Sequence, residues 1–164
     1  MTDLTIWYLQ ADSPEQLKTS PSPGGIDVVE VQESQFEFNR FLYQLIGQPW
    51  QWTDKLDWTN HQWRDYVERD SLRTWVAWVK GSPAGYFELE KRADNSVEIC
   101  YFGLAPRFIG RGFGAYLLSK AIEEAWGWQA ERVTVNTCSL DHPSALNNYQ
   151  SRGFDLVDTV VKPG

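Results

Sequence analysis

The segment GLAPRFIGRGFGAYLL, from Gly103 to Leu118, joins an apolar run typical of a strand to an apolar run typical of a helix. Gly110, Gly112 and Gly114 alternate at the junction between them. Glycine permits positive φ and adds no Cβ, so alternating glycines clear the way to the free N–H groups at a helix start. Those N–H groups and the positive end of the helix dipole attract anions such as phosphate. We therefore predict an anion-binding turn between a strand and a helix.

Two familiar phosphate-binding turns fit the neighbouring residues poorly. A P-loop needs a lysine and then a serine or threonine after its last glycine, but Ala115 and Tyr116 follow here. The string GRGFGA also satisfies the G-x-G-x-x-A pattern of dinucleotide-binding folds, which requires an acidic residue at the end of the next strand. That strand is predicted to end at Asn136, Thr137 and Cys138. The P-loop is thus excluded, and a dinucleotide-binding fold is disfavoured.

The rest of the chain alternates between strand-like and helix-like segments. Short runs rich in β-branched and aromatic residues predict strands at residues 4–10, 25–32, 74–81, 82–90, 97–104, 132–138 and 155–160. Helical spacing of apolar residues predicts helices that begin at Ser34 and at Asn60, a helix over residues 113–126, and a short helix with Pro143 at its first position. This order predicts an α+β fold (mixed α/β) with a central twisted, mostly antiparallel mixed sheet flanked by helices.

The length of the chain predicts one domain that covers residues 1–164. The segment TSPSPGG, residues 19–25, is rich in the residues that form linkers, and it separates the first strand from the rest. Ser34 and Glu37 have the spacing of a capping box at the start of the first helix. Phe41 belongs to the apolar residues of that helix that we expect to face the core.

Charge and composition limit the classes of partner. A net charge of −7 argues against binding to nucleic acid or to an anionic membrane, because either would need clustered Lys and Arg. The sequence has no uninterrupted apolar run of the length that spans a bilayer and no basic leader, so we expect a cytoplasmic protein. Cys100 and Cys138 form neither a CxxC motif nor a metal-ligand spacing, and we expect no metal.

Two segments together resemble a known family. PRFIGRGFGAYLL resembles the pyrophosphate loop of the GNAT superfamily of N-acetyltransferases, whose pattern is [QR]-x-x-G-x-[GA]. SALNNYQSRGF, residues 144–154, resembles the C-terminal motif A-[IL]-x-x-Y-x-x-x-G-F of the same superfamily. The resemblance extends over residues 26–158 and leaves residues 1–25 as an extra N-terminal strand and linker. It implies an acyl-CoA N-acyltransferase-like fold.

The resemblance also implies an activity. A member of this superfamily would move the acetyl group of acetyl-CoA, its co-substrate, to a primary amine by direct attack through a tetrahedral intermediate. By similarity, Tyr149 is the acid that protonates the departing thiolate, and the Leu104 N–H donates to the oxyanion. The alternative is a catalytically weak CoA-binding sensor or interaction module, to which two departures from the family pattern, Ile109 and His142, would contribute.

The loop can be aligned in two registers. Arg107, Gly110 and Gly112 satisfy the pattern literally, whereas alignment on the following helix makes Gly112 and Gly114 the two glycines and puts Ile109 in place of the usual Gln or Arg. We favour the second register. In either register the backbone amides do most of the binding, and the residues expected at the cofactor are Leu104, Ala105, Ile109, Gly110, Arg111, Gly112, Phe113, Gly114, Ala115 and His142.

The general base and the acceptor site rest on residue chemistry. Glu98 lies in an apolar strand, which favours either a catalytic base with a raised pKa or a structural ion pair with an arginine. Glu88, in the preceding strand, is the second candidate base and also a candidate substrate-binding residue. Trp50, Trp52 and Trp58 fall where the resembling family binds its acceptor, and their rings could contact the ammonium of a small molecule or peptide amine. The oligomeric state is left open, and the edge of the last strand could accept a second subunit in a homodimer.

Overall fold

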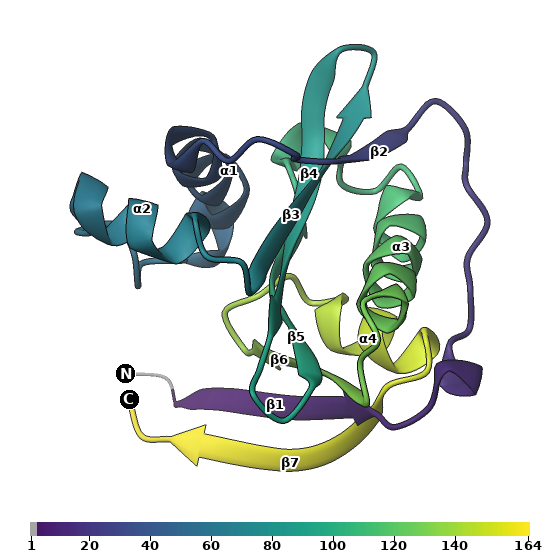
Figure 1. The fold of residues 1–164 in the computed structure, drawn as a ribbon. Helices are drawn as coiled ribbons and strands as arrows, with labels where there is room; N and C mark the ends of the chain where they lie inside the picture. The colour runs from purple at the N-terminus through teal and green to yellow at the C-terminus, as the bar shows by residue number, and fades with distance from the viewer. Residues whose placement is uncertain (1–2) are drawn as a thin grey trace.

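One seven-stranded sheet organises residues 3–164, which are the residues that this computed structural model describes (Figure 1). The order of its strands is β2-β3-β4-β5-β6-β1-β7, and each neighbouring pair is antiparallel except β5–β6. The strands are β1 (Leu4–Ala11), β2 (Asp27–Glu30), β3 (Leu72–Val79), β4 (Ser82–Lys91), β5 (Ser96–Leu104), β6 (Arg132–Cys138) and β7 (Asp155–Lys162). The expected mixed, mostly antiparallel sheet is confirmed.

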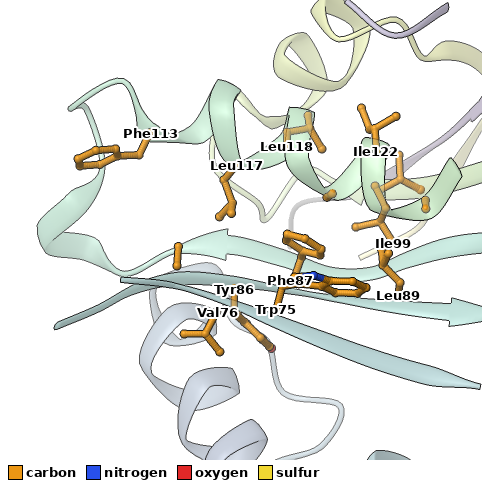
Figure 2. Packing of buried hydrophobic residues seen from close by; sticks show 14 of the residues in the cluster. Trp75, Val76, Tyr86, Phe87, Leu89, Ile99, Phe113, Leu117, Leu118 and Ile122 are labelled. Carbon is orange, nitrogen blue, oxygen red and sulfur yellow. The ribbon is translucent and has the colours of Figure 1, made fainter. Parts of the chain in front are cut away.

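Helices cover both faces of the sheet (Figure 1). Helices α1 (Phe36–Gly47) and α2 (Asn60–Val67) lie on one face, and α3 (Phe113–Gly127) and α4 (Ala145–Ser151) lie on the other. Figure 2 shows the consequence of strand alternation: Phe87 and Leu89 of β4 point toward α3, whereas Tyr86 points to the opposite side. The core is therefore built in two layers, one on each face of the sheet.

Helix α3 is held by the apolar stripe that its sequence predicts. Five side chains spaced three or four residues apart, or adjacent on the same stripe, are at most 2% exposed: Leu117, Leu118, Ala121, Ile122 and Ala125. Phe113, at the first position of the helix, is also buried. This packing fixes the start of α3 against the end of β5, so the glycine turn between them has a defined place.

The N-terminal strand is an interior strand of the sheet, although it lies outside the segment that carries the family resemblance. β1 pairs with β6 on one side and with β7 on the other. Leu9 and Ala11 of β1 belong to the main core. β7 pairs only with β1 and forms an edge of the sheet, with Leu156, Val157 and Val161 exposed. Residues 4–11 are therefore needed to join the C-terminal strand to the fold.

Leu9→Ala is expected to lower the free energy of unfolding by about 2–5 kcal/mol, the range for truncating a buried leucine. Leu9 is 1% exposed, so the change would remove packed atoms on which β1 depends. Val161→Ala, at a 57% exposed position of β7, is the control and should change stability by less than about 0.5 kcal/mol. Urea unfolding followed by circular dichroism measures both, and equal effects would contradict a core role for β1.

Three local predictions were wrong. No capping box forms at Ser34, because α1 begins after Gln35 and no side chain caps it. Phe41 is 46% exposed, since burial of Phe36 at the helix start turns that position toward solvent. Pro143 precedes Ser144, the residue at the cap of α4, and so lies outside the helix.

Candidate active site

The sheet opens between its two parallel strands. β5 and β6 pair only through Ser96–Arg132, Val97–Val133 and Glu98–Thr134, and beyond these pairs the strands separate. A cavity of about 840 Å³ is lined by the separated parts of both strands. Its walls include side chains from the α1/α2 face of the sheet, such as Trp52, and from the α3/α4 face, such as Tyr149. The cavity thus connects the two faces through the gap.

The glycine turn borders this cavity. Gly110 and Gly112 have φ of +81° and +85°, a backbone region that side-chain-bearing residues avoid. Gly112 is the N-cap residue of α3, and no side chain accepts from the N–H groups of the first turn. Gly114 and Ala115, within that turn, line the cavity. The free amides and the positive end of a 15-residue helix are therefore available to an anion there.

The residues expected at the cofactor divide into two groups. Those that line the cavity are Leu104, Ile109, Gly110, Gly114, Ala115 and His142. Ala105, Arg111, Gly112 and Phe113 do not line it. The Arg111 guanidinium lies instead 5.2 Å from the ring centroid of Phe108 and 5.4 Å from that of Phe113. The Phe113 side chain is part of the core.

The Leu104 N–H points toward the opening in the sheet. The neighbouring Ala105 N–H donates to the Ala84 carbonyl of β4 at 2.8 Å. Successive N–H groups of an extended strand point to opposite sides, so the Leu104 N–H faces β6. Since β6 has already separated from β5 at this level, that N–H has no strand partner on its side.

Tyr149 forms part of the cavity wall from α4. Its ring makes edge-on contacts with Phe102, at 6.2 Å between centroids, and Phe154, at 6.0 Å. Burial raises the pKa of the Tyr149 hydroxyl above its ordinary value, so the group keeps its proton at neutral pH. Asn148 Nδ2 donates to the Gly114 carbonyl at 3.4 Å, which ties α4 to the start of α3.

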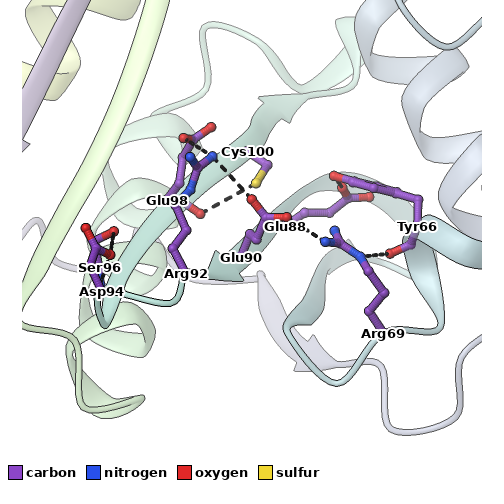
Figure 3. A network of polar contacts seen from close by, with 9 residues as sticks. All are labelled: Tyr66, Arg69, Glu88, Glu90, Arg92, Asp94, Ser96, Glu98 and Cys100. Carbon is purple, nitrogen blue, oxygen red and sulfur yellow. Dashed lines mark hydrogen bonds and ion pairs between the residues drawn. The ribbon is translucent and has the colours of Figure 1, made fainter.

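Glu98 lies in the cavity wall and is also part of an ion-pair cluster (Figure 3). Its Oε1 is 2.5 Å from Arg92 Nη2, and the same Nη2 is 3.2 Å from Glu90 Oε1. Burial raises the pKa of Glu98, and the positive charge of Arg92 opposes that rise. The structural ion pair with an arginine, one of the two roles expected for Glu98, is therefore present. The pKa of Glu98 is nevertheless raised, as a catalytic base would need.

A β-bulge changes which side chains share a face with Glu98. Glu88 pairs with Tyr101 and Leu89 pairs with Ile99, so Cys100 is an extra residue in β5. Strict alternation along residues 97–104 would put Glu98, Phe102 and Leu104 on one face, and the extra residue breaks that alternation. Glu98 and Tyr101 instead face the α1/α2 side of the sheet, while Phe102 contacts Tyr149 on the other.

Glu88 is buried at 1% exposure and does not line the cavity. Its carboxylate accepts hydrogen bonds from Tyr66 Oη at 2.6 Å and Asn39 Nδ2 at 2.8 Å. Burial raises the pKa of Glu88, and these two donors oppose the rise. Figure 3 shows Tyr66 beside Glu88. Tyr66 does line the cavity, so it connects the buried carboxyl to the cavity.

Glu88→Gln is expected to alter the pH dependence of stability. Because folding raises the pKa of Glu88, this group stabilises the folded state at pH values below the ordinary carboxyl pKa. That stabilisation is lost as pH rises through the pKa of the folded state. Glutamine does not titrate, so the stability of the variant relative to the wild type should increase as pH rises above the ordinary carboxyl pKa of about 4. Urea unfolding of both proteins at a series of pH values measures this difference, and a difference that falls with pH would contradict it.

The tryptophan-rich segment contributes two cavity walls. Trp50 and Trp52 line the cavity and Trp58 does not. The Trp50 ring meets the His142 ring edge-on at 5.1 Å, and the Trp52 ring lies 5.1 Å from that of Tyr101. Trp50 and His142 come from opposite faces of the sheet, so their contact closes one side of the gap.

Lys55 is a cavity residue that the sequence analysis missed. Its Nζ lies 4.3 Å from the ring centroid of Trp58, 4.8 Å from that of Tyr66 and 5.0 Å from that of Tyr101. Of the three tryptophans expected to contact an acceptor ammonium, Trp58 instead contacts the ammonium of Lys55. Its place between two tryptophan-containing stretches was the only signal in the sequence.

A mixed sheet that opens between two parallel strands, beside a glycine turn and an uncapped helix start, is the architecture of the acyl-CoA N-acyltransferases. The Acetyltransferase (GNAT) family matches residues 32–154, and the chain belongs to that family. The fold and the family expected from the sequence are both confirmed. Among residues 3–164, every helix is too short or too polar to cross a lipid bilayer.

Two of the three similar proteins described here extend well beyond the part that matches this chain. An uncharacterized N-acetyltransferase of Methanocaldococcus jannaschii is 28% identical over 114 residues, which cover 65% of this chain and 49% of that protein. A GCN5-related N-acetyltransferase from Kribbella flavida is 19% identical, with a TM-score of 0.70, and the match covers 98% of this chain and 60% of the other. An aminoglycoside acetyltransferase from an uncultured soil metagenomic sample is 14% identical, with a TM-score of 0.64, over 78% of this chain and 87% of its own. The chain therefore spans about half the length of the curated relative.

Proposed function

We propose that the protein is an acetyl-CoA-dependent N-acetyltransferase that acts on a primary amine of a small molecule or peptide. The observation that carries the proposal is the cavity through the opened sheet, with the uncapped start of α3 and Tyr149 on one face and aromatic walls on the other. Two substrates can approach such a cavity from opposite faces and meet between β5 and β6.

The residues at the glycine turn fit the diphosphate of coenzyme A. The first-turn amides of α3 are free of side-chain caps, and Gly114 presents no Cβ to the cavity. Anion binding there relies on backbone donors and the helix dipole, so the absence of a Gln or Arg at Ile109 removes only a side-chain contribution. Bound acetyl-CoA would supply an acetyl group activated as a thioester.

The chain offers a donor at each place where charge develops. The Leu104 N–H, which faces the opening, would donate to the carbonyl oxygen as that oxygen becomes negative. The Tyr149 hydroxyl would donate its proton to the departing sulfur. Both groups lie in the cavity wall, and the raised pKa of Tyr149 keeps the proton in place until the C–S bond breaks.

An attacking amine must first lose a proton, because an ammonium has no lone pair. Glu98 is the first candidate to accept it, since its carboxyl lines the cavity and its pKa is raised by burial. Glu88 is the second, and it would receive the proton through the Tyr66 hydroxyl that hydrogen-bonds to it. Arg92 holds Glu98 in an ion pair. This favours a positioning role for Glu98 and leaves Glu88 as a candidate for the base.

A thiol-release assay with acetyl-CoA and a panel of amines tests the proposal. We expect release that depends on both substrates, together with a thermal shift on adding acetyl-CoA. A ligand at about 100 times its Kd stabilises a protein by about 2.7 kcal/mol, so this shift is easily measured. Binding of acetyl-CoA with no release from any amine would favour the CoA-binding sensor instead, and no binding would contradict both.

A further inference from the structure

Lys55 lines the cavity, and no carboxylate of residues 3–164 lies within 4 Å of its ammonium, although the charges of Glu88 and Asp54 act on it from further away. None of the ion pairs among residues 3–164 includes Lys55. Its Nζ donates one hydrogen bond within the same residues, to Tyr101 Oη at 3.0 Å. An ammonium has three N–H donors, so two remain for a ligand. Because Lys55 lines the cavity, a ligand there can reach them.

Aromatic rings hold this ammonium in one place. The centroids of Trp58, Tyr66 and Tyr101 all lie within 5.0 Å of Lys55 Nζ. Burial lowers the pKa of Lys55, whereas contact with the negative faces of these rings favours the cation and restricts a side chain that is otherwise flexible. The Lys55 backbone N–H also donates to Tyr43 Oη at 3.1 Å, which fixes the base of the side chain. The positive charge is thus preorganised at the α1/α2 end of the cavity.

Carboxylates paired with arginines lie further along the same cavity wall. Glu90, Arg92 and Glu98 belong to one cluster, and Arg69 also pairs with Glu90, so two guanidinium groups balance the two carboxylates. Glu98 and Tyr101 share a face of β5 and are three residues apart, which corresponds to roughly 7–10 Å along a strand. The cavity wall therefore presents the Lys55 ammonium outside a neutral cluster of arginines and glutamates.

We propose that Lys55 binds a carboxylate of the acceptor, so that the preferred acceptors are amines that also carry a carboxylate, such as amino acids or short peptides. This inference rests on the proposed function and specifies its substrate class. The acceptor carboxylate would take the two free donors of Lys55, and the ammonium end would lie toward Glu90 and Glu98. Polyamines and aminoglycosides, which carry only positive charge, would meet the Lys55 ammonium with repulsion.

Matched acceptors test the inference. Phenylalanine is compared with phenethylamine, and lysine with cadaverine, in the thiol-release assay. We expect the wild type to favour the member of each pair that has the carboxylate. Lys55→Met keeps the length of the side chain without its charge, and it should raise KM for the carboxylate member by about 10–100-fold, the effect of one lost charge-assisted hydrogen bond. The kcat for that member and the kcat/KM for its partner should change by less than about threefold.

Two further variants separate recognition from folding. Lys55→Arg keeps the charge and should restore at least part of the carboxylate preference that Lys55→Met removes. Lys162→Met removes one charge at the exposed end of β7 and should leave both acceptors of each pair unchanged. Equal losses for both members of a pair in Lys55→Met would contradict carboxylate recognition, and so would a wild-type preference for the amines without a carboxylate.

A binding measurement makes the result independent of turnover. The protein is labelled with ¹³C at the lysine side chains, and N-acetylphenylalanine is titrated against N-acetylphenylalaninamide. A shift of the Lys55 resonance with the carboxylate alone supports the inference even if no amine is acetylated, in which case the proposed function fails and the binding site stands. No shift, or equal shifts with both, overturns the inference. Acetylation of Lys55 itself, detected by mass spectrometry after incubation with acetyl-CoA, would also overturn it.

Discussion

Tyr149→Phe is expected to lower kcat by about 10²–10⁴-fold, the range for loss of a positioned general acid or base. The substitution removes only the hydroxyl, and the ring that contacts Phe102 and Phe154 remains. The variant should therefore fold and bind acetyl-CoA with a Kd within about threefold of the wild type. A departing thiolate without this proton donor is a poorer leaving group, so the loss appears in the chemical step. Single-turnover thiol release measures that step directly.

A matched tyrosine controls this experiment. Tyr8 lies on β1, is 37% exposed, and does not line the cavity. Tyr8→Phe should leave kcat and KM unchanged. Because burial raises the pKa of Tyr149, its hydroxyl should stay protonated between about pH 7 and pH 9. The wild-type kcat should therefore not fall over that range through loss of this proton. An equal kcat in Tyr149→Phe and the wild type would exclude Tyr149 as the acid.

The parts of the fold that the sequence predicts well are those in which local pattern and packing agree. β6 is an alternating run whose bounds, Arg132–Cys138, coincide with the predicted strand. In α3 the apolar stripe is long enough to fix both the element and the buried face. The glycine turn was also predictable, since two of its glycines adopt the positive φ that motivates their presence. Here propensity, pattern and turn chemistry point to the same structure.

The features that the sequence could not predict depend on contacts between distant segments. The bulge at Cys100 is a property of the register between β4 and β5, and the residues around it alternate in the sequence as if no bulge were there. The place of β1 between β6 and β7 likewise depends on pairing across the whole length of the chain. Periodicity identifies a strand, but it does not say which strands are its neighbours.

The sequence predicted some residues of the candidate site but not Lys55. The turn, Tyr149 and Glu98 are marked by motif or by an unusual residue type, and all three border the cavity. Lys55 lies in a polar loop and has no such mark. The place of its ammonium depends on the rings of Trp58, on the same loop, Tyr66 of α2 and Tyr101 of β5. Only the folded chain brings those three rings together, so the charge that they surround becomes visible in the structure.

Gly114→Ala is expected to weaken acetyl-CoA binding by about 10–100-fold, the effect of losing one hydrogen bond to a charged group. The added Cβ would lie 3.8 Å from Leu104 Cδ1 and 3.9 Å from Asn148 Nδ2, which are ordinary contacts, so the variant can fold. It would also project where the first turn of α3 borders the cavity, between the free N–H groups and an approaching diphosphate. Isothermal titration with CoA measures the loss.

The same substitution should stabilise the protein, and this opposite sign separates ligand exclusion from damage to the fold. Alanine is favoured over glycine inside a helix by up to about 1 kcal/mol. Gly127, at the other end of α3, has no atom within 4 Å of an added Cβ, and it does not line the cavity. Gly127→Ala should therefore be at least as stable as the wild type and should bind CoA unchanged. If Gly114→Ala were more stable than the wild type and bound CoA with unchanged affinity, the added methyl group would not obstruct the anion. The anion would then have to bind away from the amides of α3.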